Sequence, residues 1–463
     1  MAKRKVLGAV DRIDRRNVNY TLLYNYVNTI FNQYYSKVEV HGLENIPKDA
    51  PVIFAPNHQN ALMDALIVLF SSPGDTVFLA RADLFKKKLL AKALNSLKIL
   101  PVFRIRDGVE ELGKNQEIFD ITVNVLHRKH QLCIMPEGNH GDKRRLRNLG
   151  KGVFRIAFKT QEKMGNQPYV KIVPVGLDFS DYIKHYQTLH IVYGKPIEVS
   201  EYWDTFEENG PKGLNQLKQR LQDEMLPLMI HIETDDFYDM YLGLRTVYNQ
   251  RMREILQIQG HRLNDKFRAD KEMIDRLNLV LEKDEQKLHP LRDKVERYTS
   301  QVKKMNIRDW VVTSKGYSFG RTLWRFFSLL LTLPIFIYGA INNALLYFLP
   351  VRMVRNIKDK QFHSSVKAGA SILLILPISY LLQTLLVGLL TPEWYWWVIY
   401  LVTLYPLGRL ALIWYFRLKK TLRGSWFRRQ IRKGSKEALE LVELRESIVK
   451  DTDELIADLV VSE

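Results

Sequence analysis

The stretch PVIFAPNHQNALMDALIVLF, residues 51–70, changes its hydrophobic pattern halfway along and so decides what kind of fold the chain adopts. Its first residues form a short apolar run that stops at Pro56, which is typical of a buried strand. Its second half, from Ala61 to Phe70, is apolar over a length that suits a helix. A strand that leads directly into a helix is the unit from which α/β folds are built.

The same alternation continues over residues 37–200, where helical patterns follow several apolar runs, at 61–70, 83–97 and 115–128. We therefore expect an α/β domain at 37–200, with a mixed sheet flanked by helices. Sites in such folds form at the carboxyl ends of strands, so chemistry-bearing residues should follow the runs directly. The candidate strands are KVEVHG, PVIFAP, TVFLAR, ILPVFRIR, LCIMPEG, VKIVPVGLDF and LHIVYG.

His58 and Asp64 stand at the first of these strand ends. We expect Asn60 to cap a helix that begins at Ala61. Asp64 then lies one turn into the helix and, because helical side chains lean toward the N-terminus, points back at His58. A carboxylate that accepts from one imidazole nitrogen leaves the other nitrogen free as a base. Taken alone, the pair also fits a structural histidine near an aspartate that favours the helix dipole.

Later strand ends carry more polar residues. In LKILPVFRIRDG, Arg104 and Arg106 would share one face of a strand and form a phosphate grip, unless they are solvated surface residues. In VKIVPVGL, Pro174 should end or bulge its strand. Cys133 is expected to pack as a small apolar side chain.

The stretch LCIMPEGNHGDKRRLRNLGKG ends a strand at Pro136 and turns through Glu137 and Gly138. Glu137 would hold a substrate hydroxyl or fix a nearby arginine, and His140 is a candidate polar contact. The loop that follows is basic, with Lys143, Arg144, Arg145, Arg147 and Lys151.

Four ordered motifs are thus present: His…Asp, Pro–Val–x–Arg, Pro–Glu–Gly with a trailing Lys–Gly, and Val–Pro–Val. Together they resemble the glycerophospholipid acyltransferase family over about residues 35–200. The resemblance implies that His58 and Asp64 are catalytic and that Arg104 binds glycerol phosphate. It also places Glu137 and Gly138 in the third motif and Pro174 in the fourth; Arg106 and Lys151 would add to the phosphate grip.

Two departures from the family pattern bear on substrate choice. The spacer between His58 and Asp64 is QNALM, five residues where four are usual, a length found in one branch of glycerol-phosphate acyltransferases. The third motif continues Asn139–His140 where Thr–Arg or Ser–His is usual.

The implied reaction is acyl transfer from acyl-CoA or acyl-carrier protein to a hydroxyl of glycerol-3-phosphate or 1-acylglycerol-3-phosphate, with His58 as general base. No metal and no bound cofactor is implied. One alternative in the same class acylates another lysolipid or an amino-acid-linked lipid. Another is a catalytically inactive membrane scaffold that binds partners through helices at 201–310.

The composition narrows the partners. The 463 residues include 69 Lys and Arg against 51 Asp and Glu, a net charge of +18, which calls for an anionic partner. Many of the basic residues border apolar segments, so membrane lipids are favoured and nucleic acid is not. A single cysteine excludes an intramolecular disulfide and favours a reducing compartment.

Charged or amphipathic helices are expected outside the α/β domain. Residues 1–36 contain an amphipathic helix that either packs on the next domain or lies on a membrane surface. Residues 201–319 form a charged helical extension, a hairpin or coiled coil. Residues 435–463 form one C-terminal helix.

Residues 320–434 form the expected membrane region, with spans at about 368–391 and 394–416. The basic tail RLKKTLRGSWFRRQIRK makes these two spans an in–out–in hairpin. The segment 326–350 has arginines on both flanks and is interrupted by Pro334 and by Asn342–Asn343, so we expect a re-entrant or interfacial hairpin there. The protein is thus expected to be integral to the membrane, the inner membrane in a bacterium, with its active site at the cytoplasmic face.

Overall fold

The computed structural model describes residues 13, 17–86, 88–102, 115–165 and 169–460. The chain divides into two compact units. The first unit holds Met1–His231 together with Ile357–Ala368, and the second holds Ile232–Asn356 and Gly369–Glu463.

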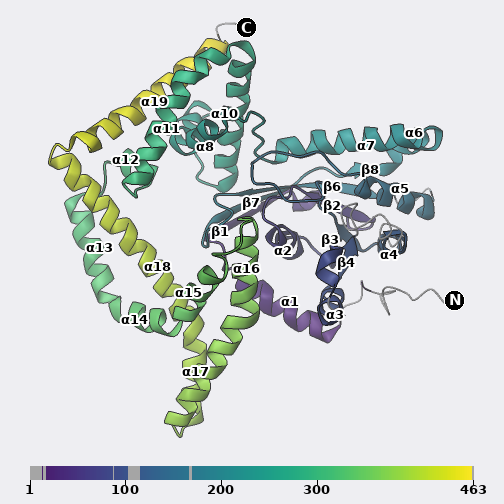
Figure 1. Cartoon of the computed structure of the whole chain (residues 1–463), viewed down its shortest axis with the longest axis horizontal. Helices are drawn as coiled ribbons and strands as arrows, with labels where there is room; N and C mark the ends of the chain where they lie inside the picture. Colours follow the sequence, from purple (N-terminus) through teal and green to yellow (C-terminus); the bar gives the residue numbers. More distant parts are fainter. Residues whose placement is uncertain (1–12, 14–16, 87, 103–114, 166–168, 461–463) are drawn as a thin grey trace. The chain divides into compact units, whose positions relative to one another are not determined.

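An eight-stranded mixed sheet forms the centre of the first unit (Figure 1). Its order is β1-β7-β6-β2-β5-β3-β4, and the short β8 pairs with β6. All pairings are parallel except those of β6 with β7 and β8. The strands are β1 Lys37–His41, β2 Val52–Pro56, β3 Thr76–Arg81, β4 Ile99–Val102, β5 Gln131–Cys133, β6 Lys171–Phe179, β7 Thr188–Tyr193 and β8 Ile197–Glu198.

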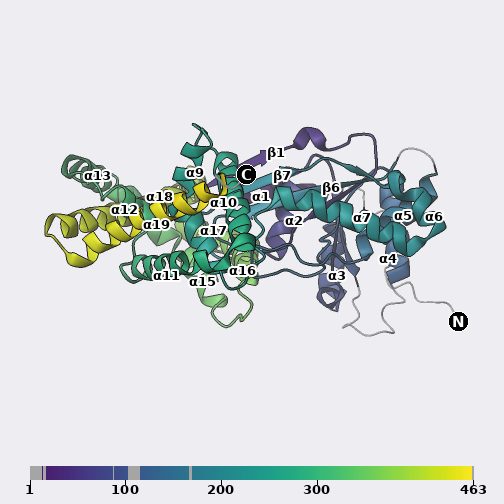
Figure 2. The same cartoon turned by 90° about the horizontal axis from the view of Figure 1, so that it is seen from above.

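Helices cover both faces of this sheet (Figures 1 and 2). On one face, apolar side chains of α4, α5 and α7 join Ile53 and Ala55 of β2 in the main hydrophobic core. Phe54 points to the other face, where it meets Tyr193, whose hydroxyl contacts Ser71 of α2. The helices of this unit are α1 Val18–Phe31, α2 Leu62–Ser71, α3 Lys88–Ser96, α4 Asn115–His127, α5 Gly152–Met164, α6 Trp203–Glu208, α7 Gly210–Met225 and the start of α16 Phe362–Ala370.

The N-terminal helix α1 packs within the first unit. Phe31 is buried and contacts Phe70 of α2 at a ring distance of 5.1 Å, and Tyr24 contacts the same ring at 5.3 Å. These contacts match the packing interpretation of the amphipathic pattern.

The sequence predicted that Pro174 ends or bulges its strand; it does not end the strand, because β6 continues to Phe179. The Pro174 carbonyl accepts a hydrogen bond from the Gly194 N–H, so this residue faces the break between β7 and β8. In a strand, the backbone nitrogen and the carbonyl of one residue point to the same side. Proline has no N–H, and at Pro174 the position of this missing donor therefore lies at the break between β7 and β8, where no ladder hydrogen bond is made.

The second unit contains charged helices that bury their apolar faces together. The helices are α8 Tyr238–Val247, α9 Asn249–Ile255, α10 Leu263–Lys283, α11 Leu288–Lys304, α12 Asp309–Thr313 and α19 Lys436–Val460. Buried ion pairs join them, such as Arg245 with Asp270 at 2.8 Å. Arg445 of α19 lies 2.8 Å from Asp309 of α12, so the C-terminal helix is part of this bundle.

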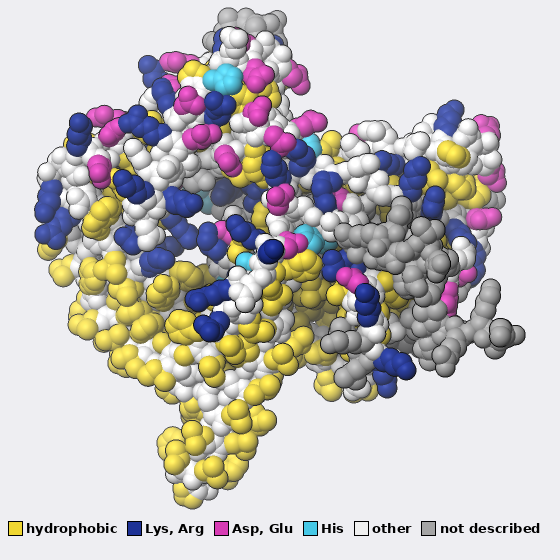
Figure 3. Space-filling model, viewed as in Figure 1, with side chains coloured by type: hydrophobic (Ala, Val, Ile, Leu, Met, Phe, Trp, Pro, Cys, Tyr) yellow, Lys and Arg dark blue, Asp and Glu magenta, His cyan; other side chains and the backbone are white. Residues whose placement is uncertain are grey.

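The same unit carries the apolar helices, and Figure 3 shows hydrophobic side chains gathered over them. They are α13 Phe319–Leu331, α14 Leu333–Asn342, α15 Ala344–Met353, α17 Leu376–Leu390 and α18 Trp394–Arg432. Within the described residues, Phe362–Leu390 and Trp394–Arg432 are long and apolar enough to cross a membrane. The pair α13–α14 is bent by 56° and counts as a third span only if both helices belong to it.

The predicted fold class is confirmed: an α/β domain with a mixed sheet, a helical extension and apolar C-terminal helices long enough for a membrane. The breaks in the first apolar segment fall at Thr332 and Asn343, beside the predicted interruptions. The first unit ends at His231 and not at residue 200, because α7 contributes Leu217 and Leu221 to the core of the sheet. It also includes residues 357–368, which the sequence assigned to the membrane region.

Candidate active site

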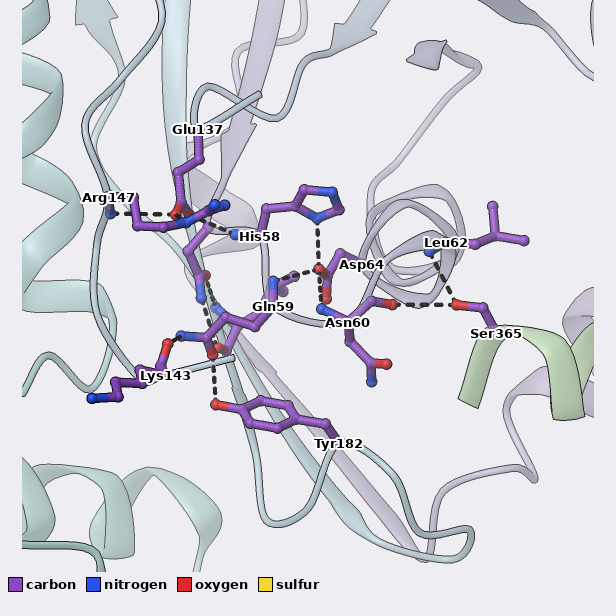
Figure 4. A network of polar contacts seen from close by, with 12 residues as sticks. His58, Gln59, Asn60, Leu62, Asp64, Glu137, Lys143, Arg147, Tyr182 and Ser365 are labelled. Atoms are coloured by element: carbon purple, nitrogen blue, oxygen red, sulfur yellow. Dashed lines mark hydrogen bonds and ion pairs between the residues drawn. The ribbon is translucent and has the colours of Figure 1, made fainter. Parts of the chain in front are cut away.

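The turn after β2 brings His58 and Asp64 together, as the sequence predicted (Figure 4). His58 Nδ1 lies 2.9 Å from Asp64 Oδ2, and the aspartate side chain is fully buried. A carboxylate accepts hydrogen bonds, so Nδ1 carries the proton and Nε2 has a free lone pair. Among the described residues no hydrogen bond reaches Nε2, and the His58 side chain is 14% exposed. In this geometry a neutral His58 imidazole can accept a proton at Nε2.

Asp64 also organises the turn itself. Its Oδ2 accepts the backbone N–H of Gln59 at 2.8 Å and that of Asn60 at 2.7 Å. The prediction that the Asn60 side chain caps α2 is wrong, because the helix begins at Leu62 and no side chain caps it at Ala61. Asp64 instead acts from inside the first turn on donors that precede the helix, the N–H groups of Gln59 and Asn60.

The five-residue spacer is accommodated by Ala61, whose φ of 45° is unusual for a residue with a β-carbon. The residue lies at the start of α2, with a ψ of −123°. A backbone in this region is strained by about 1–3 kcal/mol. The longer spacer is therefore fitted between strand and helix by a strained turn, and the contact between His58 and Asp64 is kept.

Glu137, after β5, braces the turn that carries His58. Its Oε1 accepts the His58 backbone N–H at 2.7 Å, and its Oε2 accepts from Arg147 Nε at 2.9 Å. The carboxylate is 1% exposed. Burial raises the pKa of Glu137, and the bonds from His58 and Arg147 oppose that rise. Of the two roles predicted for Glu137, these contacts match the fixing of an arginine.

The rest of the third motif forms a turn followed by a basic loop, in which some of the basic side chains are already paired. Gly138 has a φ of +69°, which favours glycine, and its N–H bonds the Met135 carbonyl at 3.0 Å. Arg144 is buried and pairs with Asp178, so it serves the fold. Lys151 is exposed at the start of α5 and remains available to an anion.

Other predicted residues divide between those the structure describes and those it does not. Arg104 and Arg106 lie outside the described residues. Cys133 is buried in β5, and burial raises the pKa of its thiol well above the ordinary value, as suits an apolar packing role. The described residues contain no group of His, Cys, Asp or Glu that could hold a metal ion.

The structure adds residues that the sequence analysis did not single out. Asn57 bonds the Leu177 backbone N–H at 2.7 Å and carbonyl at 3.2 Å, which ties the end of β2 to β6. Gln59 links the Lys143 carbonyl to the Tyr182 hydroxyl at 3.1 and 2.9 Å. The stretch Pro–Asn–His–Gln could have indicated these two residues, since amide side chains on either side of a histidine at a strand end can brace its loop.

Comparison with known proteins identifies the domain. The family model described as Acyltransferase matches residues 37–178. This part of the chain is thus similar to an acyltransferase domain. It runs from the start of β1 into β6 and contains His58, Asp64 and Glu137. The match agrees with the acyltransferase resemblance drawn from the four motifs.

The comparisons with solved structures and with curated proteins give a weak likeness and no match, respectively. One matching solved structure is the crystal structure of the 1-acyl-sn-glycerophosphate (LPA) acyltransferase PlsC from Thermotoga maritima. It is 22% identical, with a TM-score of 0.29, and the match covers 43% of this chain and 79% of that chain. No curated protein matches the chain.

Proposed function

We propose that this acyltransferase is a membrane-bound O-acyltransferase of phospholipid synthesis. It transfers a fatty acyl group from acyl-CoA or acyl-carrier protein to a hydroxyl of glycerol-3-phosphate or 1-acylglycerol-3-phosphate. The observation that carries the proposal is the contact between His58 Nδ1 and Asp64 Oδ2, inside an acyltransferase domain and at the carboxyl end of β2.

The chemistry follows from the free nitrogen of His58. Nε2 takes the proton of the acceptor hydroxyl as the oxygen attacks the thioester carbonyl. The C–S bond then breaks, and the leaving thiolate takes the proton back from the imidazolium. No covalent enzyme intermediate is needed, because a thioester is already activated. A positioned base of this kind contributes roughly 10²–10⁴-fold.

The acceptor phosphate is assigned to cations of the second and third motifs. Arg144 and Arg147 are engaged with Asp178 and Glu137. Arg104 and Arg106 from the second motif, together with the exposed Lys151, make up the proposed phosphate grip. Lys151→Ala should therefore raise the KM for a phosphorylated acceptor more than it lowers kcat.

The apolar helices fit this role. Helices of membrane-spanning length would hold the domain at the lipid surface where an acylated acceptor lies. The tail of α18 is rich in lysine and arginine, so we assign the tail and the active site to the cytoplasmic face. Reporter fusions at residues 310 and 360 would show on which side of the membrane each residue lies. The proposed re-entrant hairpin requires both residues to lie on the same side.

The test is an acyl-transfer assay of the purified full-length protein in lipid vesicles. Labelled acyl-CoA and acyl-carrier protein are each offered with glycerol-3-phosphate, 1-acylglycerol-3-phosphate and a panel of other lysolipids. We expect one of the two phosphorylated glycerols to be acylated and His58→Ala to lose that activity. Exclusive use of another lysolipid, or equal activity of His58→Ala, would refute the proposal.

A further inference from the structure

Residues 357–368 lie in sequence between the apolar helices α15 and α17, yet they fold as part of the first unit. Helix α16, which starts at Phe362, continues through a π-helical turn at Ser371–Ile375 into α17. The segment is thus continuous in the chain with a helix of membrane-spanning length. Its side chains contact the acyltransferase site at several points.

One contact is with His140, from the loop after the third motif. His140 Nε2 lies 2.7 Å from Asp359 Oδ2, and the ring of Phe362 meets the imidazole edge-on at 4.8 Å. The His140 side chain is only 10% exposed, so it is held between these two residues of the segment. Because a carboxylate accepts, Asp359 fixes the proton on Nε2 and with it the rotation of the ring.

The His140 imidazole packs against the ring of His58, the proposed base. The rings of His140 and His58 are perpendicular, at 88°, with centroids 5.6 Å apart. His58 is therefore bordered by two groups: the Asp64 carboxylate fixes one nitrogen, and the His140 ring restricts the space in which the imidazole can tilt.

The same segment also supports the turn that carries the dyad. Ser365 Oγ accepts the Leu62 backbone N–H at 3.1 Å, one of the N–H groups left free at the start of α2. It also lies 3.4 Å from the Asn60 carbonyl (Figure 4). Ser364 Oγ bonds the carbonyl of Tyr182, whose hydroxyl in turn bonds Gln59.

We propose that Asp359 is a positioning residue for acyl transfer, which acts on His58 through His140. The proposal rests on the function proposed above and deepens it: a segment between the apolar helices completes the active site. The competing interpretation is a simple surface ion pair, since the Asp359 side chain is 44% exposed. Such pairs contribute little to stability, so a positioning role must show in kcat and not in folding.

The experiment is a double-mutant cycle in full-length protein in lipid vesicles. Asp359→Ala should lower kcat about tenfold, since it removes a charged hydrogen bond that orients a group beside the base, with little change in acceptor KM. His140→Ala should lower kcat by a similar factor. The double variant should be no worse than either single one, because both changes remove the same effect. Asp359→Asn retains an acceptor for Nε2–H and should restore most of the activity.

Lys360→Ala is the matched control, since Lys360 is an exposed neighbour in the same segment, and it should match the wild type. Thermal unfolding of each variant checks that the fold is kept. Multiplicative losses in the double variant, or a kcat for Asp359→Ala within twofold of the wild type, would overturn the inference. His58→Ala belongs in the same assay: if it stays active, the proposed function fails; if it is inactive while Asp359→Ala is normal, only the positioning role fails.

Discussion

Asp64 in the first unit and Asn343 in the second are both buried polar residues, at 0% and 2% exposure. Asn343 lies among the apolar helices. Its amide donates to the Gly339 and Leu404 carbonyls at 2.9 and 3.1 Å, and its oxygen accepts from the Tyr380 hydroxyl at 2.6 Å. Both side-chain atoms of Asn343 are therefore satisfied.

The turn around Asp64 is not satisfied in the same way. Asp64 Oδ1 and Asn60 Oδ1 are buried, and no hydrogen bond reaches either of them within the described residues. The neighbouring His58 Nε2 is likewise without a hydrogen bond there. Buried polar atoms without partners are rare in folded proteins and call for an explanation. The network around Asn343 thus joins helices through satisfied bonds, whereas the network around Asp64 leaves buried acceptors without partners, as the proposed catalytic role would allow.

The largest expected effect tests the second half of that comparison. Asp64→Asn should lower kcat by roughly 10²–10⁴-fold in the acyl-transfer assay. The amide oxygen in the place of Oδ2 can keep the bonds from Gln59, Asn60 and His58 Nδ1, but it carries no negative charge to stabilise the imidazolium that forms during proton transfer. Asp142→Asn, an exposed carboxylate of the third-motif loop, is the control and should be normal.

A kcat for Asp64→Asn within tenfold of the wild type would remove the catalytic interpretation. The polar network around Asp64 would then have a structural role, like the network around Asn343.

Glu137 tests whether the brace beneath the turn behaves as a structural group. Glu137→Ala should lower the free energy of unfolding by about 2 kcal/mol, because the His58 N–H and the Arg147 guanidinium lose a buried acceptor. Glu162→Ala, an exposed carboxylate on α5, should be nearly neutral. Chemical or thermal unfolding in detergent measures both, and equal losses would contradict the bracing role.

The raised pKa of Glu137 adds a pH dependence to this prediction. A carboxyl whose pKa is raised by folding favours the folded state most while it is protonated, so that contribution is lost as pH rises from the ordinary pKa of 4.5 through the folded-state pKa. Glu137→Gln does not titrate. The stability of the wild type relative to Glu137→Gln should therefore fall as pH rises through this range, and a constant difference would contradict it.

Much of the first unit was predictable from the sequence because its signals are local. Apolar runs marked seven of the strands, and the lean of helical side chains placed Asp64 against His58. The short β8 has only two residues and carries no run of its own. The Asn60 cap was mispredicted because cap preferences do not reveal that the Leu62 N–H is bonded by Ser365, a residue 303 positions away.

The remaining parts of the site depend on contacts between distant residues. Asp359 lies 219 positions from His140, and Ser365 lies 303 positions from Leu62. In the sequence both belong to a charged stretch between apolar segments, which is ordinary beside a membrane helix. Periodicity and spacing report neighbours within an element, so neither residue could have been assigned to the site without the fold.

Asn343 tests the first half of the comparison, with a smaller expected effect. Asn343→Ala should lower the free energy of unfolding in detergent by about 1 kcal/mol, since hydrogen bonds between apolar helices are individually weak. Its kcat per folded molecule should be unchanged. Leu345→Ala, an exposed side chain on α15, controls for the loss of a larger residue. A loss of kcat without a loss of stability would place the polar network of the apolar helices among the functional groups.

The smallest effect is expected at Ala61, where the strain of the turn is concentrated. A glycine there relieves the positive φ but loses a buried methyl group and gains entropy in the unfolded chain, so these terms nearly cancel. Ala61→Gly should change the free energy of unfolding by less than about 1 kcal/mol. Ala65→Gly, in the regular part of α2, should lose about 1 kcal/mol, because no strain is relieved there. Both variants replace an alanine of the same helix region with glycine, so equal losses would count against strain in the five-residue spacer. A smaller loss at Ala61 would show that the chain retains a costly turn in order to keep Asp64 within reach of His58.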